Sequence, residues 1–148
     1  MDNKKIMAEV SSLITEKIIS LNPSSEDLFL INNLIASYYR KRAGISNSAT
    51  NTMACAFLWA YSKSNFLWGG NKNWARQNLS ELFDANPKTV GDATFKIINA
   101  LKIRSWDERF CKKEIMKNNP FDQFMMNKEG FIVLKEDHLN FEDENKIE

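Results

Sequence analysis

The sequence predicts a mainly α protein: an orthogonal helical bundle that contains a helix-turn-helix and ends in a small β-hairpin. Apolar residues recur at three- and four-residue intervals along much of the chain, which is typical of amphipathic helices. Five glycines and three prolines in 148 residues are too few for a β-sandwich with many tight turns. At 43% hydrophobic and 26% charged residues, the composition suits one globular core. We expect a single helical domain over residues 1–136 and an acidic, flexible tail over residues 137–148.

Two amphipathic helices are predicted first. The first covers about residues 4–20, and Asn22-Pro23 ends it because a residue that precedes proline avoids the helical conformation. Ser24 can cap the second helix, with acidic residues in its first turn. The second helix is expected to end near Gly44. The apolar stripes are Ile6, Val10, Leu13, Ile14, Ile18 and Leu21 in the first helix, and Leu28, Ile31, Leu34, Ile35 and Tyr38 in the second.

A third helix is predicted over about residues 50–67, before a break at Gly69-Gly70-Asn71. It is apolar on nearly all sides, which predicts the buried centre of a bundle. The aromatic residues Trp59, Phe66 and Trp68 are expected to extend this core.

A helix-turn-helix is predicted at about residues 74–101. Leu79, Leu82 and Phe83 give the apolar face of a short helix, and Asp84-Ala85 makes a tight connection. Asn86 is a good N-cap, and Pro87 suits the first position of a helix. The second apolar stripe comprises Val90, Thr94, Ile97, Ile98 and Leu101. Two short helices joined by a turn of about three residues define the motif.

The motif suggests a face that contacts DNA. A recognition helix needs exposed polar residues near its start, with cations nearby for phosphates. The residues expected to bind nucleic acid are Lys88, Thr89, Lys96 and Asn99 on the second helix, with Arg76, Gln77 and Lys72 near the start of the first. Asp92 has the wrong sign for a phosphate and Gly91 offers no side chain, so a helix pair that only completes the core is the alternative.

The charge is uneven along the chain. Residues 71–118 carry ten basic and six acidic side chains, whereas residues 119–148 carry three basic and eight acidic ones. The basic middle segment is compatible with DNA, although its charge is small for a strong DNA-binding protein. The acidic end is typical of a solvated terminus.

The region after the helix pair is expected to be smaller. Residues 103–106 look extended, and Asp107 could cap a short helix that runs to about Lys117. The segments 121–126 and 131–134, with Gly130 between them, suggest a hairpin. This hairpin could be a wing beside the helix-turn-helix or a flap packed on the third helix.

Three segments carry a family resemblance: residues 53–67, the helix pair from Leu79 to Val90, and residues 119–133 with their Asn-Pro start and Gly-Phe-Ile-Val end. With these segments the chain resembles an uncharacterised bacterial domain family, known only as a domain of unknown function, over about residues 8–134. The resemblance implies a helix-turn-helix and a helical layout similar to the cyclin-box repeats of transcription factor IIB. It implies no catalytic residues.

No motif for catalysis, a cofactor or a metal is present. The chain lacks a phosphate-binding glycine loop, and His138, Cys55 and Cys111 lack the spacing of metal ligands. Cys55 and Cys111 are expected to be reduced, mostly buried thiols. No apolar run reaches the roughly 18 residues of a membrane span, and no secretory signal is seen. We therefore expect a cytoplasmic protein that is not an enzyme and needs no cofactor.

Two functions remain open from the sequence. The first is a helix-turn-helix regulatory protein of a bacterium or mobile element that binds double-stranded DNA. The second is a protein-interaction module, a small regulator or inhibitor that docks on a partner protein without binding nucleic acid. The oligomeric state is not predicted.

Overall fold

The computed structural model describes residues 3–41, 48–118, 124–126 and 132–134. It is mainly helical, as the sequence predicts. The chain divides into two compact units, Met1–Lys112 and Lys113–Glu148, which are described separately. The predicted domain boundary at residue 136 lies outside the described residues. Within those residues, no helix combines the length and the apolar character needed to cross a membrane.

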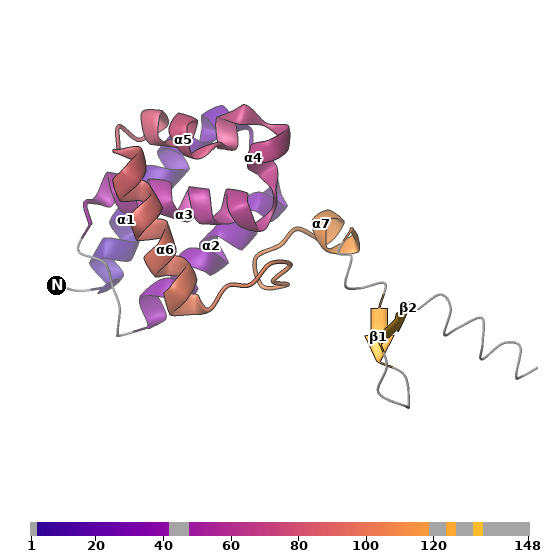
Figure 1. The fold of residues 1–148 in the computed structure, drawn as a ribbon. Coiled ribbons are helices and arrows are strands. Elements are labelled where there is room, and N and C mark those ends of the chain that lie inside the picture. The colour runs from indigo at the N-terminus through magenta and orange to yellow at the C-terminus, as the bar shows by residue number, and fades with distance from the viewer. Residues whose placement is uncertain (1–2, 42–47, 119–123, 127–131, 135–148) are drawn as a thin grey trace, which may run out of the picture. The chain divides into compact units, whose positions relative to one another are not determined.

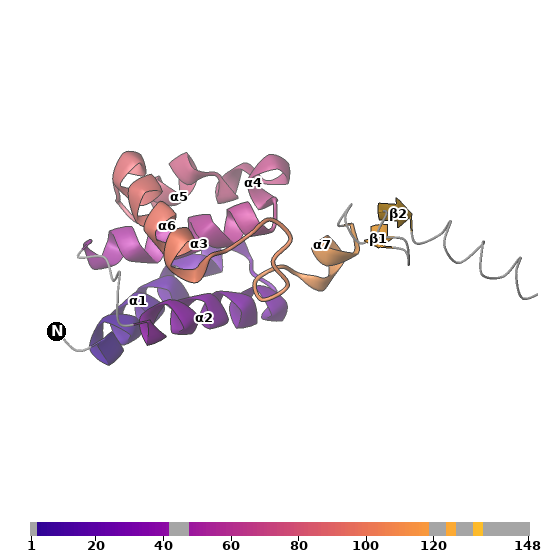
Figure 2. The ribbon, with the colours of Figure 1, turned by 60° about the horizontal axis from the view of Figure 1, so that its bottom comes forward.

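The chain begins with two helices that lie together on one side of the first unit (Figures 1 and 2). They are α1 (Asn3–Ile18), continued by the short 3-10 helix η1 (Ile19–Leu21), and α2 (Ser25–Arg40). Ser24 caps α2 as predicted: its hydroxyl accepts from the Asp27 amide, and the Asp27 carboxylate accepts from the Ser24 amide. The predicted stripes pack into the core except at Leu28, which is 40% exposed.

Helix α3 (Thr50–Ser64) is the buried centre of the unit. All residues from Thr52 to Leu58 are buried, as its apolar composition predicts. Figure 2 shows α3 between the pair α1 and α2 and the later helices of the unit. Helices α3 and α6 pack against each other, and the Thr94 hydroxyl of α6 lies 3.3 Å from the carbonyl oxygen of Ala56.

Helix α3 ends at Ser64, three residues earlier than predicted. Asn65 follows it, and Phe66 adopts a left-handed conformation with φ 55°. The short helix α4 (Leu67–Gly70) and the 3-10 helix η2 (Lys72–Trp74) come next. The prediction that Phe66 and Trp68 extend the core is wrong: they are 43% and 50% exposed, because the turn at Phe66 directs the chain away from the core.

Two helices follow at the positions where the sequence predicts a helix pair: α5 (Arg76–Leu82) and α6 (Pro87–Leu101). Asp84 ends α5 in the left-handed conformation that aspartate tolerates, with φ 52°. The Asp84 amide donates to Glu81 and the Ala85 amide to Ser80, which is the Schellman pattern of helix ends. The Asn51 amide of α3 donates to the carbonyls of Phe83 and Asp84 over 3.2 and 2.9 Å, so the central helix holds the turn.

The segment after α6 differs from its prediction. Asp107 does not cap a helix; its carboxylate binds the backbone and the guanidinium of Arg109, which also donates to the carbonyl of Leu101. The only helix that follows within the described residues is α7 (Lys113–Lys117). Phe110 is buried as expected. The Asn65 amide donates to the carbonyl of Phe110 over 2.9 Å and accepts from the Lys112 amide over 2.7 Å.

A buried polar pair lies between α2 and α3. The Tyr61 hydroxyl donates to the Asp27 carboxylate, and the Lys112 ammonium lies 3.4 Å from the same carboxylate. Burial raises the pKa of Asp27, but the hydrogen bonds from Tyr61 and Ser24 and the charge of Lys112 together outweigh it and hold the pKa below its usual value. The carboxylate therefore stays charged inside the fold.

The second unit contains α7 and two short strands, β1 (Phe124–Met126) and β2 (Ile132–Leu134). The strands pair antiparallel, with Phe124 opposite Leu134. Residues 127–131 lie outside the described residues. The complete hairpin, with its turn and a role as wing or flap, stays a prediction.

We expect Tyr61→Phe to lower the free energy of unfolding by about 1–3 kcal/mol, because the buried Asp27 carboxylate loses a donor. The control is Tyr39→Phe, since the buried Tyr39 hydroxyl has no hydrogen-bond partner among the described residues. Its removal should leave stability unchanged or raise it. Urea unfolding of both variants measures the difference, and equal losses would contradict the assigned hydrogen bond.

Acid should weaken the fold through Asp27. Because its folded pKa lies below its unfolded value, its contribution is present above the unfolded pKa and is lost as the pH falls through the folded pKa. The unfolding free energy of the natural chain should therefore fall more steeply below about pH 4 than that of Asp27→Asn. Urea unfolding over a series of acidic pH values gives both slopes, and parallel curves would count against this role.

Candidate nucleic-acid interface

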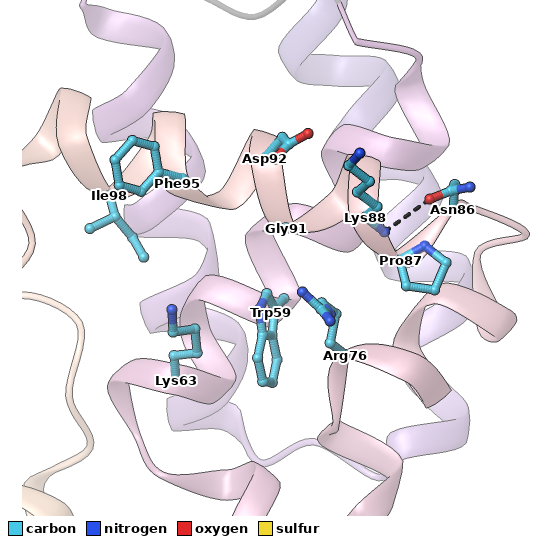
Figure 3. A pocket seen from close by; sticks show the side chains of 10 residues that line it. All are labelled: Trp59, Lys63, Arg76, Asn86, Pro87, Lys88, Gly91, Asp92, Phe95 and Ile98. Carbon is cyan, nitrogen blue, oxygen red and sulfur yellow. Dashed lines mark hydrogen bonds between the residues drawn. The ribbon is translucent and has the colours of Figure 1, made fainter.

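A groove of about 750 Å³ runs between α3, α5 and α6. Residues of α6 form one side, and Lys63, Trp59 and Arg76 form the other (Figure 3). The groove therefore brings together elements that are up to 39 positions apart in the sequence, as with Trp59 and Ile98. Its lining consists of Trp59, Lys63, Arg76, Asn86, Pro87, Lys88, Gly91, Asp92, Phe95 and Ile98.

Arg76, the first residue of α5, lies across α6 at Gly91. A Cβ atom on residue 91 would be 3.0 Å from Arg76 Nη1, so the missing side chain leaves room for the guanidinium. Within the described residues, that guanidinium makes no hydrogen bond or ion pair. Its donors are therefore free for a ligand in the groove.

Lys88 reaches the same groove from the first turn of α6. Pro87 occupies the first helical position, and the Asn86 side chain accepts from the backbone amides of Lys88 and Thr89 over 2.9 and 3.3 Å. This is the cap that the sequence predicts, and it fixes where α6 begins. The Lys88 side chain is exposed, so its ammonium can meet an anion.

The groove is cationic overall. Lys63, Arg76 and Lys88 supply three positive charges, and Asp92 supplies one negative charge. The Lys63 ammonium lies 6.0 Å from the centre of the Trp59 ring, at the outer limit of a cation–π contact. Two aromatic rings, Trp59 and Phe95, add apolar surface. The arrangement can attract an anionic ligand that also offers apolar groups.

All seven residues predicted to bind nucleic acid are exposed: Lys72, Arg76, Gln77, Lys88, Thr89, Lys96 and Asn99. The groove brings two of them together, Arg76 and Lys88. Lys96 and Asn99 lie farther along α6 and do not line the groove. The Gln77 amide donates to the Glu81 carboxylate over 3.3 Å, so it already has a partner within α5.

The sequence prediction missed Trp59, Lys63 and Phe95. Trp59 packs against the core as expected, but it is only half-buried and also lines the groove. Lys63 belongs to a helix that the sequence describes only as a buried centre. Phe95 could have been found, because it lies off the stripe that runs through Val90, Thr94 and Ile97.

The two cysteines are free and buried, as expected. Burial raises the pKa of Cys55 to about 12 and, together with the nearby Asp107 carboxylate, raises that of Cys111 to about 11. Both thiols are therefore protonated at neutral pH and poor nucleophiles. Within the described ranges, no three side chains of His, Cys, Asp or Glu are grouped so that they could hold a metal ion. His138 lies outside those ranges.

Comparison with protein-family models, curated protein sequences and solved structures found no match to this chain. The candidate site is therefore identified from the geometry and charge of its own residues.

We expect Gly91→Ala to raise the free energy of unfolding by about 0.5–1 kcal/mol, because alanine is the better residue inside a helix. The close atom is the end of the flexible Arg76 side chain, which can move aside. Gly69→Ala is the control, since no atom of the described part of the chain lies within 4 Å of its Cβ position. Thermal unfolding measures both changes; a loss at Gly91 alone would mean that Arg76 is held firmly in place.

Proposed function

We propose that this protein binds double-stranded DNA through a helix-turn-helix formed by α5 and α6, in a regulatory role. The observation that carries the proposal is the convergence of cations on one groove. Arg76 begins α5, Lys88 stands in the first turn of α6, and Lys63 comes from α3. Phosphate oxygens are the complement of such a set.

Helix α6 would be the recognition helix. The major groove of B-DNA is about 12 Å wide and admits one α-helix. In a helix-turn-helix, residues near the start of the second helix meet base edges. Lys88 and Asn99 lie on the exposed face of α6, and their side chains make no hydrogen bond or ion pair within the described part of the chain. Lysine can donate to guanine, and asparagine can pair with adenine.

Helix α5 would contact the phosphate backbone. The first helix of the motif crosses the backbone when the second enters the groove. Arg76 and Gln77 open α5, and the exposed Lys72 precedes it in η2. Lys72 and Arg76 supply two cations in the place where backbone contacts are expected, and the Gln77 amide keeps one N–H beside its bond to Glu81.

The finer architecture belongs to the same proposal. We infer that the first unit is an orthogonal bundle and that strands β1 and β2 belong to the predicted C-terminal hairpin. We propose a regulatory role and a place in the cytoplasm together with DNA binding. We also propose that the chain is related to the uncharacterised bacterial family that its sequence resembles, with a cyclin-box-like layout of its helices.

A protein partner is the second candidate. The observation that favours it is exposed aromatic surface away from the recognition helix, at Phe66 and Trp68. Aromatic residues are enriched in protein interfaces. A chain that binds no DNA at low salt would leave this alternative, a small regulator or inhibitor docked on another protein.

A salt titration with mixed-sequence duplex DNA tests the DNA proposal. Each phosphate contact contributes about −0.9 to the slope of log K against log salt. We expect Lys63→Ala/Arg76→Ala to reduce the magnitude of the slope by about 2 and to weaken binding at every sequence, because two phosphate contacts from the groove are lost.

The matched control is Lys5→Ala/Lys41→Ala, which removes two exposed lysines on α1 and just after α2. It changes the net charge equally but leaves the groove intact. Its slope should remain close to that of the natural chain. Equal losses in the two double variants would show that only bulk charge matters, and the groove would not be the interface.

A further inference from the structure

We infer that Phe95 determines sequence specificity: its ring contacts the 5-methyl group of thymine in the major groove and favours sites rich in A·T pairs. The inference rests on the proposed function, since it names what α6 would recognise. It concerns a residue that the sequence prediction did not include.

The first argument is the exposure of the ring. Phe95 is 64% exposed, whereas Val90, Ile97 and Leu101 of the same helix are buried. An exposed apolar side chain does not contribute the stabilising free energy that its burial would provide, about 25 cal/mol per Å². The Phe95 ring therefore contributes little to the core, and its apolar surface is available to a ligand.

The second argument is the position of Phe95 on α6. Residues three, four and seven positions apart lie on one face of a helix. Phe95 thus shares a face with Lys88 and Asp92, which precede it, and with Asn99, which follows it. Figure 3 shows Phe95 and Lys88 toward opposite ends of the groove lining, with Asp92 between them. If Lys88 and Asn99 face bases, Phe95 lies between them and faces bases too.

The third argument is the chemistry of the major groove. Thymine alone among the four bases carries a methyl group on its major-groove edge. Apolar side chains, phenylalanine among them, recognise this methyl group by contact. The cations at Arg76 and Lys88 offset the negative charge of Asp92 in the same groove, so a phosphate-bearing ligand can approach the ring.

Uracil-substituted DNA provides the test. Uracil pairs as thymine does but lacks the 5-methyl group. We expect the full chain to bind a short alternating A·T duplex about fourfold more tightly than the matching A·U duplex for each methyl group contacted, the effect of burying about one CH₂ equivalent. We also expect 5-methylcytosine to strengthen binding to a G·C duplex, because it places a methyl group at the same ring position.

Two variants of the full chain locate the effect. Phe95→Ala should bind the A·T and A·U duplexes equally. Phe29→Ala is the matched control, because Phe29 on α2 is 65% exposed and lies outside the groove. It should keep the preference of the natural chain for thymine. Both side chains are exposed, so thermal unfolding should show that the two variants fold.

The outcomes separate this inference from the proposed function. A natural chain that binds DNA without distinguishing thymine from uracil overturns the inference alone. A preference for thymine that persists in Phe95→Ala also overturns it. A chain that binds none of the duplexes at low salt overturns the proposed function. The remaining hypothesis is then that the exposed Phe95 ring contacts a protein partner.

Discussion

The burial of α3 from Thr52 to Leu58 is the constraint on which the rest of the structure depends. From Thr52 to Leu58 every side chain is buried, so neighbouring elements must cover the helix from all directions. Helices α1 and α2 cover one side, and α5 and α6 cover another (Figure 2). Because these helices surround α3, their outer faces form the surface of the unit. The outer face of α6 and its border with α5 form the candidate interface.

Much of the helical layout could be predicted because apolar periodicity reports which side of a helix is buried. The N-caps were also predictable, since the Ser24 and Asn86 side chains accept hydrogen bonds from backbone amides only two or three residues later. The errors have physical causes. The aromatic character of Phe66 and Trp68 suggested burial, but a left-handed residue after α3 turned the chain outward. Asp107 has the chemistry of a cap, yet its local partner is Arg109 rather than a helix.

The candidate site was only partly predictable, because exposure follows from the pattern within one helix but contacts between helices do not. Exposed residues of α6 follow from the complement of its apolar stripe, so Lys88, Lys96 and Asn99 could be named in advance. The groove lies between α3, α5 and α6, and no local sequence pattern predicts which side chains of different helices come together. Lys63 and Trp59 therefore became visible only in the folded chain. The balance of three cations and one carboxylate favours an anionic ligand, while the small net charge suits modest affinity.

The hydrogen bonds from Asn51 have a consequence for recognition. One side-chain amide at the start of α3 binds the two carbonyls at the bend between α5 and α6. The angle between α5 and α6 is thus set from inside the molecule, before any ligand arrives. Binding by such a preorganised element loses little conformational entropy, so most of the interaction energy remains available to distinguish one ligand from another.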